Sequence, residues 1–228
     1  MNYYSTGLGM GTRKKPPPST LPQATRGKET RAALLEAARR IFARNGFDGA
    51  SIRAITGEAG TNLGSVTYHF GSKRKLYAEV LKVGLTPLVD RVGEAASGGG
   101  EPLERLARVV RVFFDHLATN ADVPRLLLQE VSAGRNPPPE VVSIIQRNAM
   151  YVQGIIAEGW ADGSIRRSHP VFSALSVAAL PIYMTVMAPL IREVVGVDLL
   201  DPATRRQAAE HVQTFVRNGL AAPQEARA

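Results

Sequence analysis

Residues 51–76, SIRAITGEAGTNLGSVTYHFGSKRKL, decide the fold of this 228-residue chain. Ser51 is a candidate helix N-cap, because its hydroxyl can accept a hydrogen bond from a free backbone N–H of the first turn. Ile52, Ile55 and Ala59 then fall at i, i+3 and i+7, which places them on one helical face. The spacing predicts a short amphipathic helix over about 51–59.

A turn and a second short helix follow. Gly60 stands where the first helix must stop, since a residue without a Cβ can adopt the left-handed conformation that a sharp turn needs. Thr61 or Asn62 can cap a second helix, in which Val66 and Phe70 lie at i and i+4 and point inward. Two helices crossing over such a turn form a helix-turn-helix, whose second helix can enter the major groove of DNA.

Helical segments flank this unit on both sides. Residues 28–45 predict an amphipathic helix that Gly46 ends, with Phe47 folding back over its last turn. Ser72 is expected to cap a longer helix, which Gly84 and Pro87 should kink or break before the loop 97–100. We expect the small core that holds the first three helices to contain Phe42, Phe47, Ile55, Val66, Phe70 and Leu76.

The basic charge of the chain is concentrated in its first third. The net charge is +8, of which residues 1–25 supply +3 through Arg13, Lys14 and Lys15. Residues 26–80 contain ten Lys and Arg against five Asp and Glu, whereas residues 81–228 contain fifteen of each. A charge run is usually a solvated face, but here it coincides with the predicted helix-turn-helix, which is typical of a polyanion binder. The Gly- and Pro-rich residues 1–25 predict a disordered basic arm.

The rest of the chain also predicts helices. Pro and Gly separate candidate segments at about 102–119, 122–133, 139–161, 170–190 and 202–220, and no β-type alternation competes with them. We therefore predict an all-α fold of about nine helices. A helix-turn-helix domain would occupy 26–76, a second helical domain 77–222, and a tail 223–228.

Composition and motifs argue against several other classes of protein. The chain has no Cys, which excludes disulfides, thiolate zinc sites and Cys nucleophiles. No G-x-S-x-G, H-E-x-x-H or P-loop motif occurs, so we do not expect an enzyme. Gly7, Gly9 and Gly11 lack the strand and helix of a nucleotide fingerprint, and His116 and His169 lack acidic partners at ligand spacing, so neither a cofactor nor a metal is expected. Without an N-terminal apolar signal segment, we expect a cytoplasmic protein.

Residues 28–77 resemble the DNA-binding domain of the TetR family of bacterial transcriptional repressors. The resemblance is carried by FARNGF at 42–47, SIRAI at 51–55, EAG at 58–60 and YHFGSK at 68–73. It implies a ligand-responsive repressor that binds palindromic operator DNA as a homodimer and is released by a small, hydrophobic effector. The chain departs from the family pattern at Thr67, where a tyrosine is common, although Tyr68 follows directly, and at Thr56, where alanine is frequent.

The resemblance also implies a set of DNA contacts. Arg53 could reach a guanine edge, or could be a surface arginine paired with Glu58 or a phosphate. Leu63 could touch a thymine methyl group or could belong to the core. Tyr68, His69 and Lys73 suit phosphate contacts, with helix packing as the alternative for His69. The full candidate set is Ser51, Arg53, Asn62, Leu63, Gly64, Ser65, Thr67, Tyr68, His69 and Lys73.

For the second domain the resemblance implies effector binding and dimerisation. Its large apolar residues suit an adaptable pocket and equally an ordinary core. The pocket candidates are Phe113, Phe114, Leu117, Leu127, Met150, Tyr151, Trp160, Tyr183, Met184 and Met187. The dimer candidates, from the helices at 170–190 and 202–220, are Val177, Leu180, Val212, Phe215, Val216 and Leu220.

Two alternatives remain open at this point. Residues 168–191 contain no Lys, Arg, Asp or Glu and are long enough to span a membrane. Because Pro181 and Pro189 interrupt them, we favour a helix buried between its own domain and a partner subunit, and expect no membrane. The second alternative is a DNA-organising or activating protein that shares the fold and needs no ligand.

Overall fold

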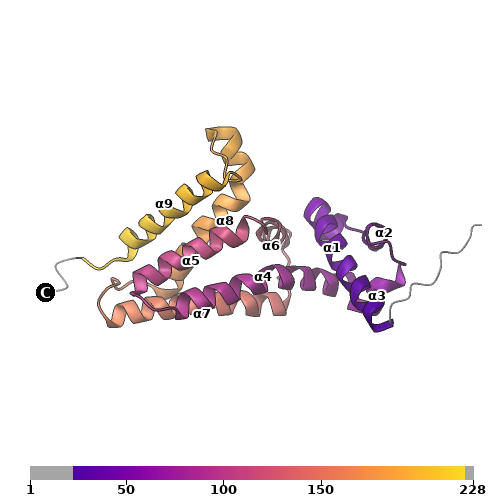
Figure 1. Cartoon of the computed structure of the whole chain (residues 1–228), viewed down its shortest axis with the longest axis horizontal. Helices are drawn as coiled ribbons and strands as arrows, with labels where there is room; N and C mark the ends of the chain where they lie inside the picture. Colours follow the sequence, from indigo (N-terminus) through magenta and orange to yellow (C-terminus); the bar gives the residue numbers. More distant parts are fainter. Residues whose placement is uncertain (1–22, 224–228) are drawn as a thin grey trace, which may run out of the picture.

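The computed structural model describes residues 23–223 and folds them into nine α-helices. No strand occurs among these residues, apart from an isolated bridge between Ile165 and Ala221. Figure 1 shows α1, α2 and α3 gathered at one end, with α4 running from them into the bundle formed by the later helices. The helices are α1 (Gln23–Gly49), α2 (Ile52–Glu58), α3 (Gly64–Phe70), α4 (Lys73–Ser97), α5 (Pro102–Leu117), α6 (Asp122–Ser132), α7 (Pro139–Ala161), α8 (Pro170–Val195) and α9 (Pro202–Leu220).

The predicted all-α fold with about nine helices is confirmed, and two helix bounds differ from expectation. α1 begins at Gln23 rather than near Lys28, because its first turns are polar and carry no apolar period that would reveal a helix. α8 continues to Val195 and ends at Gly196, whose φ of 72° provides a left-handed C-cap. The predicted arm before residue 23 and the tail after residue 223 lie outside the described residues.

The turn chemistry of the helix-turn-helix matches the sequence at most positions. The Ser51 hydroxyl accepts a hydrogen bond from the Ala54 N–H at 3.0 Å, and the Ser72 hydroxyl accepts one from the Lys75 N–H at 3.2 Å. Gly60 adopts φ 65° between α2 and α3. Both predicted caps and the left-handed turn are therefore confirmed.

The start of α3 corrects the expectation of a side-chain cap from Thr61 or Asn62. The residue that precedes α3 is Leu63, and no side chain accepts from the first-turn backbone N–H groups. The Asn62 Oδ1 instead accepts a hydrogen bond from the Ser65 hydroxyl at 3.2 Å, while the Asn62 carbonyl accepts one from the Ser65 N–H at 3.1 Å. Asn62 thus closes the first turn of α3 through a side chain and a carbonyl.

The core of the first three helices extends into the later part of the chain. Phe42, Ile55, Val66, Phe70 and Leu76 are buried as predicted, with Phe47 partly buried against them. The same cluster contains Val123 and Leu126 of α6 and Val141 of α7. In packing terms, α6 belongs to the core of the helix-turn-helix end of the molecule.

α4 passes through Gly84 and Pro87 without a break. Proline removes one backbone donor from a helix and leaves an upstream carbonyl short of a partner. For Pro87 that carbonyl belongs to Val83, four residues earlier. The buried His116 of α5 places its Nε2 2.8 Å from the carbonyl of the next residue, Gly84. A Cβ built on Gly84 would lie 2.5 Å from a methyl group of Val123, so the glycine lets α6 approach closely. Of the expected kink or break, the break is therefore wrong, because α4 continues from Lys73 to Ser97 with α5 and α6 packed against this segment.

Candidate nucleic-acid interface

The face of α2 and α3 that points away from the core is open and carries most of the predicted contacts. Tyr68 is 84% exposed and Leu63 is 53% exposed, which excludes a core role for Leu63. Ser51, Arg53, Asn62, Gly64 and Thr67 are also exposed. α3 is two turns long and carries Gly64, Thr67 and Tyr68, while Asn62 and Leu63 lead into it and Ser51 and Arg53 lie at the start of α2. A short exposed second helix of this kind is the geometry of a groove-reading helix.

Two of the candidate residues occupy less open positions. Ser65 is buried, and its hydroxyl is engaged with Asn62, so its side chain supports the turn and does not face solvent. His69 is half-buried in the last turn of α3 and makes an edge contact with the Tyr68 ring, at 4.9 Å between centroids. Ser65 and His69 therefore set the position of α3 and of the exposed Tyr68.

Arg53 has no ion pair among the described residues. The acid considered as its partner, Glu58, pairs instead with Arg40 at 2.5 Å and Arg44 at 2.9 Å. The hydrogen bond from Arg40 lowers the pKa of the Glu58 carboxyl. Because Glu58 pairs with two arginines of α1, the Arg53 guanidinium has no carboxylate partner among the described residues at the start of α2.

Lys73 lies at the first turn of α4, directly after the Ser72 cap. Its Nζ sits 4.5 Å from the centre of the Phe47 ring and makes one long contact, 3.5 Å, to the Asp48 carbonyl oxygen. No carboxylate pairs with it among the residues of the described chain. A lysine held by an aromatic ring beside free helix N–H groups is well placed to meet a phosphate.

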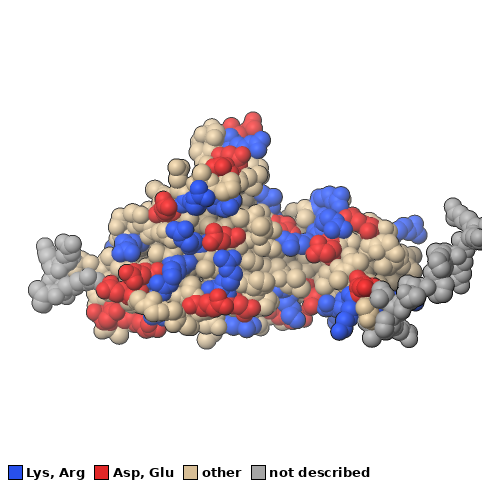
Figure 2. All heavy atoms as spheres, in the orientation of Figure 1, with Lys and Arg blue, Asp and Glu red and all other residues tan. Residues whose placement is uncertain are grey.

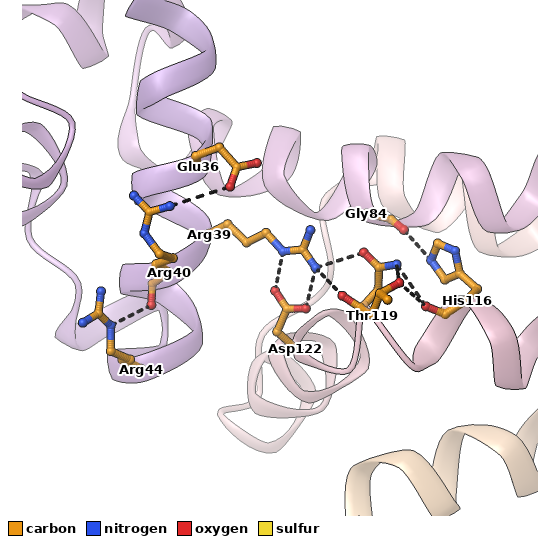
Figure 3. Close-up of polar contacts among 9 residues, drawn as sticks. Glu36, Arg39, Arg40, Arg44, Gly84, His116, Thr119 and Asp122 are labelled. Carbon is orange, nitrogen blue, oxygen red and sulfur yellow. Dashed lines mark hydrogen bonds and ion pairs between the residues drawn. The ribbon is translucent and has the colours of Figure 1, made fainter. Parts of the chain in front are cut away.

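A polar clamp joins α1 to the loop between α5 and α6 (Figure 3). The Arg39 guanidinium donates to both carboxylate oxygens of Asp122, at 2.7 and 2.8 Å. It also donates to the Asn120 side chain at 2.9 Å and to the Thr119 carbonyl at 3.3 Å. The hydrogen bond to Asp122 raises the pKa of Arg39, which stays charged. The clamp fixes the helix-turn-helix end against the first residue of α6.

A second set of ion pairs holds the other end of α6. The Glu130 side chain is almost fully buried, and its carboxylate pairs with Arg74 of α4 at 2.5 Å and with Arg135 at 3.0 Å. Arg135 also pairs with Asp48, just before α2, at 2.8 Å. A buried carboxylate is costly unless such partners compensate it, so the position of Arg74 and of the start of α4 is tightly defined.

The sequence analysis missed both sets of contacts. Val123, Leu126 and Glu130 fall at i, i+3 and i+7 of α6, so an acid stands on the buried face of a helix. That placement is a readable signal of a paired charge. The identity of its partners is not readable, because Arg74 lies 56 residues earlier in the chain.

The predicted pocket residues do not line one cavity. Phe114, Leu117 and Met184 line a small cavity between α5, α6, α8 and the start of α9, whereas Met150 and Tyr151 border a separate open groove beside Gly98–Gly100. Phe113 is buried in the core of the C-terminal helices, Leu127 packs against the helix-turn-helix core, and Tyr183 is exposed. Trp160 donates to the Arg166 carbonyl, and Met187 is half-buried.

The predicted dimer residues divide into two groups. Val177, Val212 and Val216 are buried in the subunit's own core, whereas Phe215 is 62% exposed. Leu180 and Leu220 are half-buried and line an open apolar groove of about 530 Å³ between α8 and α9. The outer face of α8 is apolar as well, through Val171, Phe172, Leu175, Tyr183 and Leu190.

α8 is long and apolar enough to cross a membrane by length and composition alone. Only 22% of its most apolar window is buried within the subunit. By contrast, acidic and basic side chains are interspersed over much of the surface of the C-terminal helices on the face shown in Figure 2. An uncharged face of this size on an otherwise charged surface is typical of an interaction site.

Two protein-family sequence models match the chain. One is described as bacterial regulatory proteins, tetR family, and matches residues 34–80. The other is described as tetracyclin repressor-like, C-terminal domain, and matches residues 102–216. Together they cover the helix-turn-helix and most of the helical bundle behind it.

Curated relatives and solved structures agree with these matches. The transcriptional regulator RutR of Escherichia coli O157:H7 is 25% identical over 207 residues, which cover 86% of this chain and 95% of RutR. The transcriptional repressor KstR2 of Mycolicibacterium smegmatis is 31% identical over 141 residues, 60% of this chain and 67% of KstR2. A tetR-family regulatory protein from Rhodococcus RHA1 shares the fold with a TM-score of 0.71 at 19% identity, covering 86% of this chain and 98% of that one.

Proposed function

The chain belongs to the tetR family of bacterial regulatory proteins, and from this premise we propose that it is a ligand-responsive repressor that binds palindromic operator DNA as a homodimer. The observation that carries the proposal is the open face of α3, where Tyr68 and Leu63 are exposed, together with the exposed Arg53 of α2, which has no ion pair among the described residues. Lys73 flanks this face at the start of α4. Groove contacts from α3 and phosphate contacts from Tyr68 and Lys73 would together fix the register of the protein on duplex DNA.

The homodimer is supported by the uncovered face of α8 and α9. One helix-turn-helix reads only a few base pairs, so a two-fold dimer on a palindromic site is needed for useful specificity. Phe172, Leu175 and Phe215 are exposed on this face, and the groove between the helices is apolar. A second copy of the same face would bury them in a four-helix arrangement, which also accounts for the apolar character of α8 without a membrane.

Release by an effector is supported by the way the two ends of the molecule are joined. α6 is fixed to the helix-turn-helix end by Asp122 and Glu130, and it packs against α4 at Gly84. An effector that shifts α6 or α4 would therefore change the angle of α3 in each subunit. In a dimer this changes the separation of the two recognition helices, so a modest preference for one state is amplified into release.

The names of the relatives support repression more than activation. KstR2 and AcnR are named repressors, whereas FasR of Mycolicibacterium smegmatis, 32% identical over 101 residues, is named an activator. We take repression as the proposed mode. A protein that binds its operator with unchanged affinity in the presence of every effector tested would instead fit the ligand-independent alternative.

The dimer is tested by sedimentation equilibrium and operator binding on a matched pair of variants. Phe215→Asp places a charge on the proposed interface, and Leu128→Asp places one on an equally exposed leucine of α6 away from it. We expect wild type and Leu128→Asp to sediment at twice the chain mass of 24.5 kDa, and Phe215→Asp at the chain mass with loss of operator binding. A monomeric wild type, or a Phe215→Asp variant that remains dimeric and active, would refute this part of the proposal.

A further inference from the structure

The cavity between α5, α6, α8 and the start of α9 has apolar walls and a charged rim. Leu117 and Leu199 are buried, and Met184 lies half-buried beside them. Two arginines, Arg125 of α6 and Arg205 of α9, also belong to the lining. The open space is about 40 Å³, enough for the end of an alkyl chain. Met184 is unbranched and flexible, so it can move aside for a longer one.

These two arginines differ from the other half-buried arginines of the described chain. Arg125 has no hydrogen bond or ion pair, and Arg205 makes one long contact, 3.4 Å, to the Leu200 carbonyl. The nearby Asp201 is already engaged, since its carboxylate accepts from the Thr204 N–H and hydroxyl at the start of α9. Each of the other half-buried arginines has a carboxylate partner at ion-pair distance or, for Arg108, a carbonyl partner at 2.6 Å: Arg31, Arg39, Arg74, Arg91, Arg105, Arg108 and Arg135.

We infer that this cavity is the effector site and that the effector is a small amphipathic acid, with a carboxylate between Arg125 and Arg205 and an apolar tail against Leu117 and Met184. A guanidinium that is partly withdrawn from water gains most from a charged acceptor, and none of the described residues supplies one here. The apolar walls favour an alkyl or aryl group over a sugar or an amide. The inference rests on the proposed function and names its ligand class.

The same cavity touches the clamp on Arg39. Ala118 and Ala121 line it, and the two residues between them, Thr119 and Asn120, bind the Arg39 guanidinium on the other side of the loop. A ligand that pushes on residues 118–121 therefore acts on the contact that holds α1 in place (Figure 3). The residues that line the cavity, Ala118 and Ala121, therefore alternate along one five-residue segment with the clamp residues Thr119, Asn120 and Asp122.

The first test is calorimetric titration of the full chain with hexanoate and with 1-hexanol, which has the same tail and no charge. Hexanoate is expected to bind, and 1-hexanol to bind at least about tenfold more weakly. Arg125→Gln and Arg205→Gln should each weaken hexanoate binding by about tenfold or more. The matched control is Arg206→Gln, the exposed next residue on α9, which should change it by less than about twofold.

Three results would overturn the inference. These are no binding by any straight-chain carboxylate of four to eight carbons up to about 10 mM, equal binding of alcohol and acid, or unchanged binding in both arginine variants.

The second test measures operator affinity by fluorescence anisotropy with and without hexanoate. Asp122→Asn should still bind hexanoate but should no longer respond to it. If hexanoate changes the operator affinity of Asp122→Asn as much as that of wild type, the clamp does not transmit the effect of the ligand to the helix-turn-helix.

The two proposals fail in different ways. Operator binding without carboxylate binding would leave the regulator intact and remove this effector class. Carboxylate binding that depends on Arg125 and Arg205, in a chain that binds no duplex DNA, would keep the site and remove the proposed function.

Discussion

Arg39 of α1 and Asp122 of α6, 83 residues apart in sequence, form a two-pronged ion pair in which both carboxylate oxygens accept from the guanidinium, at 2.7 and 2.8 Å. Both side chains are less than one third exposed, so solvent screening reduces the interaction only in part. Since α6 shares its core with the helix-turn-helix, this pair and the apolar contacts of Leu126 act together. The pair ties the helix-turn-helix end to the helical bundle.

The first prediction concerns the strength of this pair. Asp122→Asn should lower the free energy of unfolding by about 1–2 kcal/mol, because it removes a charged acceptor from a hydrogen-bonded guanidinium. Arg39→Gln combined with Asp122→Asn should cost less than the sum of the single changes, since they remove one shared interaction. Chemical denaturation measures both. Arg111→Gln, at an exposed arginine of α5 that has no ion pair among the described residues, is the control and should stay within about 0.5 kcal/mol. If the losses in free energy of unfolding of the two single variants add up fully in the double variant, Arg39 and Asp122 do not stabilise the fold through a shared interaction.

Lys73 provides a test of phosphate contact. Lys73→Ala should reduce the slope of log affinity against log salt concentration by about 0.9, the value expected for one lost phosphate contact on duplex DNA. Arg53→Ala and Tyr68→Phe should also weaken operator binding, through lost base and phosphate contacts. Operator titrations at several salt concentrations measure these effects. An unchanged slope for Lys73→Ala would remove this residue from the contact set.

Gly84 provides a test of the close approach of α4 and α6. Gly84→Ala should destabilise the fold by about 1–3 kcal/mol, because the new methyl group would lie 2.5 Å from a Val123 methyl. Adding Val123→Ala should recover part of the loss. Gly57→Ala in α2 is the matched control, since nothing lies within 4 Å of its Cβ and alanine favours a helix by about 1 kcal/mol. Thermal unfolding of wild type and the three variants tests this prediction. A Gly84→Ala variant more stable than wild type would contradict the structure.

The buried imidazole of His116 is expected to make the fold less stable in weak acid. Burial lowers the pKa of its imidazole below the usual 6.5, and the charges of Arg91 and Arg39 act in the same direction. The unfolded chain therefore binds a proton more readily than the folded one just below pH 6.5, and stability falls as the pH drops through that window. His116→Gln keeps a donor for the Gly84 carbonyl and does not titrate. The unfolding temperature of wild type should fall more steeply than that of His116→Gln between pH 7.5 and 5.5, and parallel curves would exclude the effect.

The helices were predictable because their ends carry local chemistry. Pro102, Pro139, Pro170 and Pro202 each stand at the first turn of a helix, where the missing N–H costs nothing. Ser51 and Ser72 act as caps through their own hydroxyls. These signals lie within a few residues of the structure that they specify, so one sequence suffices to read them.

The contacts that join the two ends of the molecule were not predictable in the same way. Glu130 shows by its place on an apolar helix face that it needs partners, but nothing local identifies Arg74 and Arg135. The pocket residues were chosen by size and polarity, which core and cavity residues share. Phe113 and Phe114 are neighbours in sequence, yet only Phe114 reaches the cavity.

The most direct test of the central claim is selection of binding sites from a random duplex DNA library by the full-length chain. Recognition by two copies of α3 related by a two-fold axis predicts enrichment of an inverted repeat, with half-site centres about 34–36 Å apart or a multiple of that distance. Tyr68→Ala should abolish the enrichment while the protein remains folded and dimeric. Enrichment of a site without two-fold symmetry, or no enrichment of any duplex at low salt, would contradict the account.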